Sequence, residues 1–339
     1  MIIDGHSDIL IDVGKRWARG ERGRLAEFHV PRMLEGGVTG AWCPIAVDNP
    51  SHVGDPFERA RRTLDAVHHE VARSGGSVEI VRDAQAFERT MRAGKVALFL
   101  GMEGAMPLAG DVERLRWFHG AGVRWVGLTW NAPNEVGRGL GSPGTGGLTD
   151  AGRVLLDEMQ RLGIVIDLTH GSPELYSDAF AATTAPLAVS HSNARALCDH
   201  VRNLDDAQLA LAAQRDGIVG VNLFPALLRD DGAPPTMDDV VRHAAYLRDH
   251  LGEGGVTFGF DFIDYDEAAM AAGLAASALD YGASTTYPPG VADTRGGRNV
   301  VAALADAGWN HDQTEAIAWR NLVRLVAAVE AHAQGGQPS

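Results

Sequence analysis

The sequence predicts an α/β fold of the (β/α)8 TIM-barrel class, in which eight parallel strands alternate with helices. Short runs rich in Val, Ile, Leu and Gly recur along the chain and are separated by stretches with helical periodicity. Most of these runs are continuously apolar, which suits strands buried on both faces of a parallel sheet. The chain has 339 residues, and a barrel of this class typically needs about 250.

The eight apolar runs are expected to be the barrel strands, and right-handed crossovers would close the barrel. They are Ile2–His6, Val38–Val47, Val96–Glu103, Trp125–Trp130, Gly163–Thr169, Leu187–His191, Gly217–Leu223 and Val256–Phe262.

Amphipathic helices are expected between the strands. The segment Asp150–Leu162 shows the reasoning: Thr149 can cap its N-terminus, and apolar residues such as Val154 and Leu155 fall at helical spacing. We interpret residues 1–339 as one barrel domain that ends in a long helix over 313–332. The other expected helices are Asp55–Ser74, Asp83–Ala93, Asp205–Gln214 and Met237–Leu251.

Composition excludes several classes of partner. The formal net charge is −14 and no basic cluster is visible, which argues against nucleic acid and anionic membranes as partners. Cys43 and Cys198 lie in apolar or mixed surroundings, so we expect buried free thiols. No apolar run approaches the ~18 residues of a spanning helix, and no signal peptide precedes Asp4. These features predict a cytoplasmic protein.

Candidate metal ligands stand where the predicted strands end. A barrel gathers its functional groups at the C-terminal ends of its strands, and five of the eight strands end in His, Asp or Glu. Nitrogen and oxygen ligands without thiolate suit Zn²⁺, with Mn²⁺, Fe²⁺ or Co²⁺ as alternatives. The set is large enough for two divalent ions. Its members are His6, Asp8, Glu103, His170 and His191. Asp261, a carboxylate beyond these ligands, could accept the proton of the hydroxide and pass it to a leaving amine.

Each of these residues also has a plainer interpretation. His6 and Asp8 would form a polar turn, and Glu103 would be a solvated strand end. Against this interpretation of Glu103, its flanking glycines, Gly101 and Gly104, allow close backbone approach, which favours a crowded site. His170 would cap the helix that begins near Ser172-Pro173-Glu174, and His191 would bond its neighbouring serines. Asp264 competes with Asp261 as a catalytic carboxylate.

Six motifs, taken together and in order, are highly specific. They are D-G-H-S-D, G-M-E-G, G-L-T-D-A-G, R-L-G-I-V-I-D-L-T-H, S-H-S-N-A-R-A-L and V-R-N-L-D-D. With them the chain resembles, over nearly its whole length, the membrane (renal-type) dipeptidase family, peptidase family M19, a branch of the amidohydrolase-like metal-dependent hydrolases.

The resemblance implies a role for each ligand. His6 and Asp8 would bind one zinc ion, His170 and His191 would bind a second, and Glu103 would bridge the two.

The resemblance also implies two roles outside the ligand set. Asp261 would be the proton shuttle, and Arg202 would grip the terminal carboxylate of the substrate. A guanidinium suits that task because it can hold a carboxylate through two parallel hydrogen bonds.

Two departures from the family pattern fall on the substrate side. Leu128-Thr129-Trp130 replaces the usual Leu-Thr-His, and that histidine would normally donate to the carbonyl oxygen of the scissile bond. Trp130 offers an indole N–H in different geometry, or an aromatic wall of the pocket. Asp261-Phe262-Ile263-Asp264 replaces the usual Asp-Phe-Asp-Gly. We infer that the hydrolytic centre is retained and that substrate preference has drifted.

The sequence therefore predicts a metal-dependent dipeptidase that hydrolyses a dipeptide, or a similar small amide, with a hydroxide bridging two metal ions. The resemblance implies tolerance of a D-residue at the second position. One alternative is a related hydrolase acting on a lactone, an N-acyl amino acid or a biosynthetic intermediate. Another is a non-catalytic binding protein on the same scaffold. Barrels of this kind often pair, so a homodimer is a further expectation.

Overall fold

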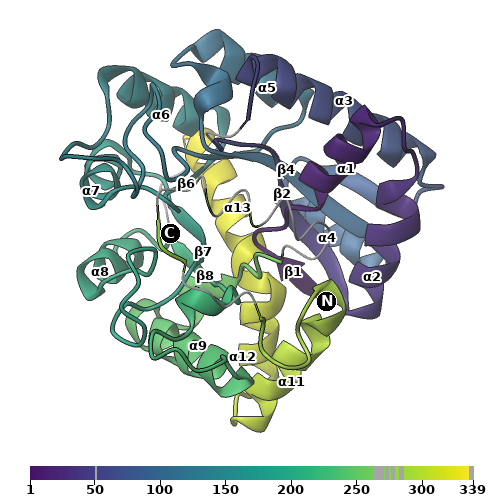
Figure 1. Ribbon diagram of the computed structural model, residues 1–339, viewed down its shortest axis with the longest axis vertical. Coiled ribbons are helices and arrows are strands. Elements are labelled where there is room, and N and C mark those ends of the chain that lie inside the picture. The colour runs from purple at the N-terminus through teal and green to yellow at the C-terminus, as the bar shows by residue number, and fades with distance from the viewer. Residues whose placement is uncertain (50–51, 263–270, 272–274, 276–278, 282–285, 336–339) are drawn as a thin grey trace.

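The computed structural model describes residues 1–49, 52–262, 271, 275, 279–281 and 286–335. Within them lies one parallel sheet, whose strands follow the order β1-β2-β4-β5-β6-β7-β8-β9, while β3 pairs with β4 beside this path. Helices surround the strands in Figure 1. The strands are β1 (Ile2–Asp4), β2 (Val38–Val47), β3 (Val78–Val81), β4 (Val96–Glu103), β5 (Trp125–Gly127), β6 (Val165–Asp167), β7 (Ala188–Ser192), β8 (Ile218–Val221) and β9 (Val256–Phe258).

The first and last strands of this order meet through a few hydrogen bonds, so the barrel is nearly closed. The Gly5 N–H donates to the Phe258 carbonyl at 2.8 Å. The Asp4 carboxylate adds a side-chain link, because its Oδ1 accepts from the N–H of Phe260 at 2.8 Å and of His6 at 3.1 Å. A Cβ at position 5 would lie 2.5 Å from the Phe258 oxygen, so only glycine allows this approach. The predicted fold class is confirmed.

Helices cover the outside of the sheet. The α-helices are α1 (Ile9–Ala18), α2 (Val30–Glu35), α3 (Pro56–Arg73), α4 (Ala84–Arg92), α5 (Val112–Ala121), α6 (Asp150–Leu162), α7 (Pro173–Ala182), α8 (Asp206–Ala213), α9 (Met237–Leu251), α11 (Gly297–Asp306), α12 (His311–Glu315) and α13 (Asn321–Ala333). Two π-helical turns, η1 (Leu25–His29) and η6 (Ala316–Arg320), lead into α2 and α13. Short 3-10 turns are η2 (Met106–Leu108), η3 (Pro225–Leu227), η4 (Glu253–Gly255) and η5 (Thr294–Gly296).

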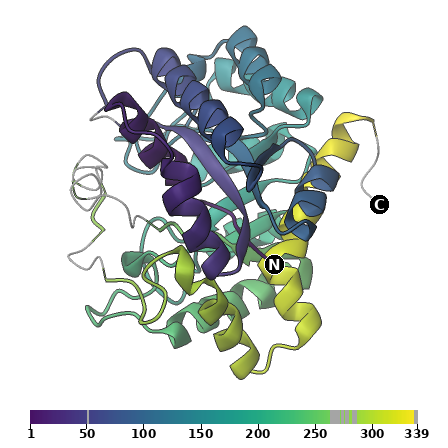
Figure 2. The same cartoon turned by 90° about the vertical axis from the view of Figure 1, so that its right-hand side faces the viewer.

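Helix α13 closes the end of the barrel where the strands begin. Asn321 donates from Nδ2 to the carbonyl of Val256, the first residue of β9, at 2.7 Å. Arg324 donates from Nη2 to the carbonyl of Asp216, just before β8, at 3.0 Å. Figure 1 shows α13 crossing the barrel, and Figure 2 shows it from the side. The opposite end, where the strands finish, is the end at which barrels of this class carry their functional residues.

The structure confirms all eight predicted strands and corrects their ends. Trp125–Trp130 was expected to be extended throughout, but β5 stops at Gly127. The sequence reading missed β3, whose four residues pair with the first half of β4 while β5 pairs with the second half. A run of four residues, V-E-I-V, is too short to be separated from a loop by pattern alone.

Most helix predictions are confirmed. Helix α6 has the predicted bounds, and the Thr149 hydroxyl accepts from the Gly152 N–H at 3.0 Å, as a cap should. Val154 was wrongly placed on its apolar face, because it is 55% exposed. The helix expected over 313–332 is a continuous helical run from α12 through η6 to α13.

Two expectations from composition can also be compared with the structure. Cys43 and Cys198 are buried free thiols, as predicted. Among the described residues, no helix combines the length and apolar character needed to cross a bilayer.

Candidate metal centre

The five predicted ligands converge at the C-terminal end of the barrel. His6 and Asp8 follow β1, Glu103 is the last residue of β4, His170 follows β6, and His191 lies in β7. Glu103 is at the centre: its Oε1 is 2.9 Å from His170 Nε2 and 3.5 Å from the Nε2 atoms of both His6 and His191. Residues up to 185 positions apart in the chain therefore share one small space.

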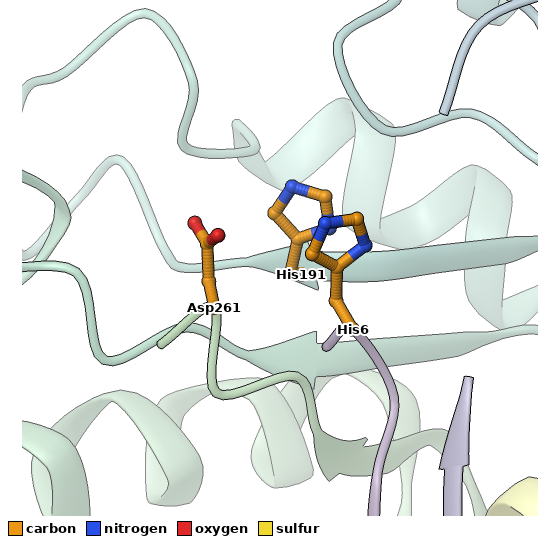
Figure 3. A group of neighbouring side chains, drawn as sticks. All are labelled: His6, His191 and Asp261. Atoms are coloured by element: carbon orange, nitrogen blue, oxygen red, sulfur yellow. The ribbon is translucent and has the colours of Figure 1, made fainter. Parts of the chain in front are cut away.

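The ligand atoms fall into three overlapping groups. Within each group the candidate atoms all lie within 4.8 Å of one another. The group of His6, Asp8 and Glu103 and the group of Glu103, His170 and His191 share the carboxylate of Glu103. This is the arrangement expected of a ligand that bridges two ions. Figure 3 shows the third group, with its side chains directed toward the same space. The groups are His6 with Asp8 and Glu103, Glu103 with His170 and His191, and His6 with His191 and Asp261.

Hydrogen bonds behind His191 fix which of its nitrogens faces the centre. The Ser190 hydroxyl donates to Asp167 Oδ2 at 2.5 Å, so its oxygen is left to accept from His191 Nδ1 at 2.9 Å. The imidazole then carries its hydrogen on Nδ1 and turns the lone pair of Nε2 toward Glu103. Metal-binding histidines are commonly oriented by such an outer partner.

Asn131 orients His170 in the same way. Asn131 Oδ1 lies 2.7 Å from His170 Nδ1, and the Asn131 amide nitrogen lies 3.2 Å from the Tyr281 hydroxyl. The amide oxygen can only accept, so His170 Nδ1 carries the hydrogen and Nε2 presents a lone pair. His170 has a φ of 68°, which a non-glycine residue rarely adopts, so the local backbone is strained at this predicted ligand.

These lone pairs fit a cation better than they fit one another. His170 Nε2 and His191 Nε2 are 3.2 Å apart, although neither carries a hydrogen in this network. Three further atoms are buried without a hydrogen-bond partner in the part of the chain described: His6 Nδ1, His6 Nε2 and Asp8 Oδ1. Ligands about 2.0–2.1 Å from a tetrahedral zinc ion would be roughly 3.3 Å apart. The residues present therefore suit divalent ions.

Charge leads to the same conclusion. Burial, and then the charge of Arg202, lower the pKa of His6 to about 3, so its imidazole is neutral and able to bind metal. Burial, and then the charge of Asp261, raise the pKa of Asp8 to about 7. Burial and neighbouring acids also raise the pKa of Glu103 well above its usual value. Crowded buried carboxyls need a cation before all of them can ionise.

Asp261 is held at the edge of this centre by strained backbone. Its φ is 57°, its N–H donates to the His6 carbonyl at 3.2 Å, and its own carbonyl accepts from the Tyr287 hydroxyl at 2.5 Å. Asn222 Nδ2 donates to its Oδ2 at 3.0 Å. Burial raises the pKa of Asp261 to about 6, against the opposing effects of Asn222 and Arg202. A carboxyl in this range can exchange a proton near neutral pH.

The two predicted substrate residues also border the centre. Arg202 is 3% exposed; its Nη2 lies 3.5 Å from the His191 carbonyl oxygen, and its Nε has no partner among the described residues. Trp130 is largely buried, and its indole lies 5.8 Å from the imidazole of His170, measured between ring centroids. Asp264, the competitor of Asp261, is outside the described residues.

The sequence model of the membrane dipeptidases, peptidase family M19, matches residues 1–339. This chain belongs to the membrane dipeptidase family. It is accordingly a metal-dependent hydrolase of the dipeptidase class.

Individual relatives agree with this assignment. The dipeptidase is 32% identical to an uncharacterised protein from the pqqA 5′ region of Klebsiella pneumoniae, over 81% of this chain and 98% of that one. It is 28% identical to the dipeptidase aclJ of Aspergillus oryzae, over 97% and 78%. A Rhodobacter sphaeroides metallopeptidase, solved with a phosphinate mimic of the dipeptide L-Ala-D-Ala, superposes with a TM-score of 0.84 at 28% identity, covering 97% and 99%.

Sequence reasoning missed the residues that orient the dipeptidase's predicted ligands. Asp167 and Ser190 stand inside motifs that were recognised, D-L-T-H and S-H-S, so their positions beside the histidines were already visible. Asn131 directly follows Trp130 and was equally close at hand. No sequence motif indicated Tyr281, because it contacts Asn131 although the two residues are 150 positions apart in the chain.

Glycines make room around Glu103, as expected. A Cβ at Gly104 would overlap the Asp48 carboxyl, and its φ of 102° also requires glycine. A Cβ at Gly101 would overlap the indole of Trp125. Both glycines therefore allow the end of β4 to be packed tightly against its neighbours.

Proposed function

We propose that this dipeptidase holds two divalent ions, zinc by the chemistry of the donors, and cleaves dipeptides beside them. His6, Asp8 and Glu103 would hold one ion, and Glu103, His170 and His191 the other. The observation that carries the proposal is the position of Glu103, whose Oε1 lies within 3.5 Å of three imidazole nitrogens. Each ion would have nitrogen and carboxylate ligands, the donors that zinc accepts in hydrolases.

Divalent ions bound there would supply Lewis acidity and lower the pKa of water. The chain's own residues then divide the remaining work. Asp261, with a pKa of about 6, would take a proton from the attacking water and give it to the departing amine. Arg202 would bind the terminal carboxylate of the dipeptide through its spare donors. Trp130 would form a wall of the pocket beside His170.

The substrate class is proposed as dipeptides with a D-residue in the second position. The Rhodobacter sphaeroides relative binds a mimic of L-Ala-D-Ala, and this chain keeps the predicted ligand set. Trp130 replaces the histidine that the family resemblance leads us to expect, so we propose a narrower range of accepted side chains. Because binding and turnover depend on shape at this wall, stereochemical preference should be measured directly.

A panel of matched L-Xaa-D-Xaa and L-Xaa-L-Xaa dipeptides, assayed with added Zn²⁺, tests the proposal. We expect release of free amino acids from the L,D members and loss of activity after chelation, with recovery when metal is returned. Absence of hydrolysis across the panel, with turnover of a lactone or an N-acyl amino acid, would reject the dipeptide substrate in favour of another bond.

Asp261→Asn supplies the matched catalytic control for this panel. The amide keeps the size of the side chain and leaves the five predicted ligands in place, but it cannot take up a proton. We expect kcat to fall by about 10²–10⁴-fold while metal content stays at the wild-type level. Equal loss of activity and metal would instead make Asp261 a ligand.

A further inference from the structure

Tyr281 is a buried phenol beside the candidate metal centre. Neither the sequence analysis nor the proposed mechanism assigns it a role. It lies in the chain beyond β9 and is 8% exposed. Its ring packs against Phe224 at a centroid distance of 5.6 Å and against His200 at 5.4 Å. These contacts hold the ring while its hydroxyl reaches Asn131 at 3.2 Å.

Among the described residues, the direction of each hydrogen bond leaves the Tyr281 hydrogen without an acceptor. Because Asn131 Oδ1 accepts from His170, its amide nitrogen must face Tyr281 and donate to the phenol oxygen. The phenol is therefore an acceptor in this contact. Its own hydrogen is not used by Asn131. Burial raises the pKa of Tyr281, so the hydroxyl keeps that hydrogen at neutral pH.

Arg202 brings a second set of spare donors to the same place. Its guanidinium donates a side-chain hydrogen bond to the Tyr281 oxygen, and this bond and the charge of Arg202 both oppose the effect of burial on the pKa of that phenol, so the two groups are in contact. Arg202 Nε is buried without a partner in the described part of the chain, and the contact of Nη2 with the His191 carbonyl is long, at 3.5 Å. A buried guanidinium beside an uncommitted hydroxyl is suited to an anionic oxygen.

We propose that Tyr281 is a substrate-binding residue whose hydroxyl donates to the terminal carboxylate of the dipeptide, beside the guanidinium of Arg202. This inference rests on the proposed function. The substrate carboxylate would then have a neutral donor, the Tyr281 hydroxyl, in addition to the charged guanidinium of Arg202. Asn131 connects Tyr281 to the predicted ligand His170. A carboxylate held by both groups would be fixed in orientation relative to the metal centre.

The test compares Tyr281→Phe with the wild type on one L,D-dipeptide and on the same dipeptide with a C-terminal amide. Phenylalanine keeps the ring contacts with Phe224 and His200, and thermal unfolding monitors its fold. For the dipeptide we expect KM to rise about tenfold, the loss of one hydrogen bond to a charged group, with kcat within about twofold. For the amide, the variant and the wild type should be alike.

Tyr176→Phe is the matched control, because it removes another buried hydroxyl, one that donates to the Gln208 carbonyl at 3.0 Å. It should leave KM unchanged for both substrates. An unchanged KM for the dipeptide in Tyr281→Phe would overturn the inference. So would equal losses on the dipeptide and its amide, which would assign Tyr281 to the scissile carbonyl or to structure. Wild-type enzyme that cleaves no dipeptide at all would instead refute the proposed function.

Discussion

Two of the three predicted ligand imidazoles at this centre are oriented by a side chain that accepts a hydrogen bond from Nδ1. The Ser190 hydroxyl donates to Asp167 and accepts from His191 Nδ1. Asn131 Oδ1 accepts from His170 Nδ1 in the same way. His6 has no such partner among the described residues. If two ions bind as proposed, we expect their predicted ligands to differ in how firmly they are held before metal binds.

Ser190→Ala should weaken metal binding without removing a ligand. The methyl group cannot accept from His191 Nδ1, so the imidazole loses its fixed orientation, and such losses typically cost about 10–100-fold in affinity. Competition with a chromophoric chelator measures this directly. Ser177→Ala removes a hydroxyl from the exposed face of α7 and serves as control. Equal affinity in Ser190→Ala and the wild type would show that Ser190 does not orient the ligand.

Asp48 gives a prediction about pH. Burial raises the pKa of this carboxyl to about 7, although Met106 N–H and Asn134 donate to it. The unfolded chain ionises near 3.8, the model-peptide value, so between about pH 4 and 7 the folded state binds more protons, and stability falls as pH rises. The free energy of unfolding of Asp48→Asn, minus that of the wild type, should therefore increase across this range in denaturant titrations. Parallel curves would contradict the raised pKa.

At the scale of single residues, the sequence predicted the positions of those candidate site residues that lie at the ends of strands. The convergence of His6, Glu103 and His191 could be predicted because each stands beside apolar residues whose burial fixes the strand. Tyr281 could not, because its place depends on how a segment beyond β9 packs on Phe224. Asn222 was missed for a similar reason: its contact with Asp261 joins the ends of two different strands.

At the scale of elements, strand β4 is the one on which the centre depends most. Its first half pairs with β3 and its second half with β5, so its end at Glu103 is held between partners on both sides. Apolar character continues beyond several strands into the loops of the centre, and this is why the predicted strand ends overran the observed ones. Periodicity reports burial, and it does not report where pairing stops.

Gly101→Ala tests the close packing of β4. The new Cβ would overlap the Trp125 indole, which is fixed by donation from Nε1 to the Phe99 carbonyl at 3.0 Å. Overpacking of this kind costs about 1–3 kcal/mol or more, so the free energy of unfolding should fall by that amount. Gly120→Ala in α5, where nothing lies within 4 Å of the added Cβ, should instead stabilise by about 0.5–1 kcal/mol. Equal effects would contradict the packing argument.

Across the whole molecule, the two ends of the barrel have separate tasks. Helix α13 packs where the strands begin, and the predicted ligands gather where they finish. The contact of Gly5 with Phe258 brings β1 beside β9 and so places His6 next to Asp261. Closure of the barrel is thus a condition for the centre to form. Pairing of two chains and a cytoplasmic location stay predictions of the sequence.

The chain order of the strands made this arrangement predictable, since neighbours in a parallel barrel follow one another along the sequence. The extra strand β3 does not disturb the path, because it pairs with β4 beside the barrel order. What the order of elements could not predict was the spacing of the ligand atoms. That spacing follows from glycine contacts and backbone strain, which depend on the assembled fold.

The metal content of the purified enzyme tests the central claim most directly. Elemental analysis, after gentle purification and again after addition of Zn²⁺, should give two ions per chain in the wild type, because Glu103 completes two ligand groups. His170→Ala should retain the ion held by His6 and Asp8 and lose the other. Fewer than about one ion per chain, with no uptake and no activation by added metal, would contradict the account.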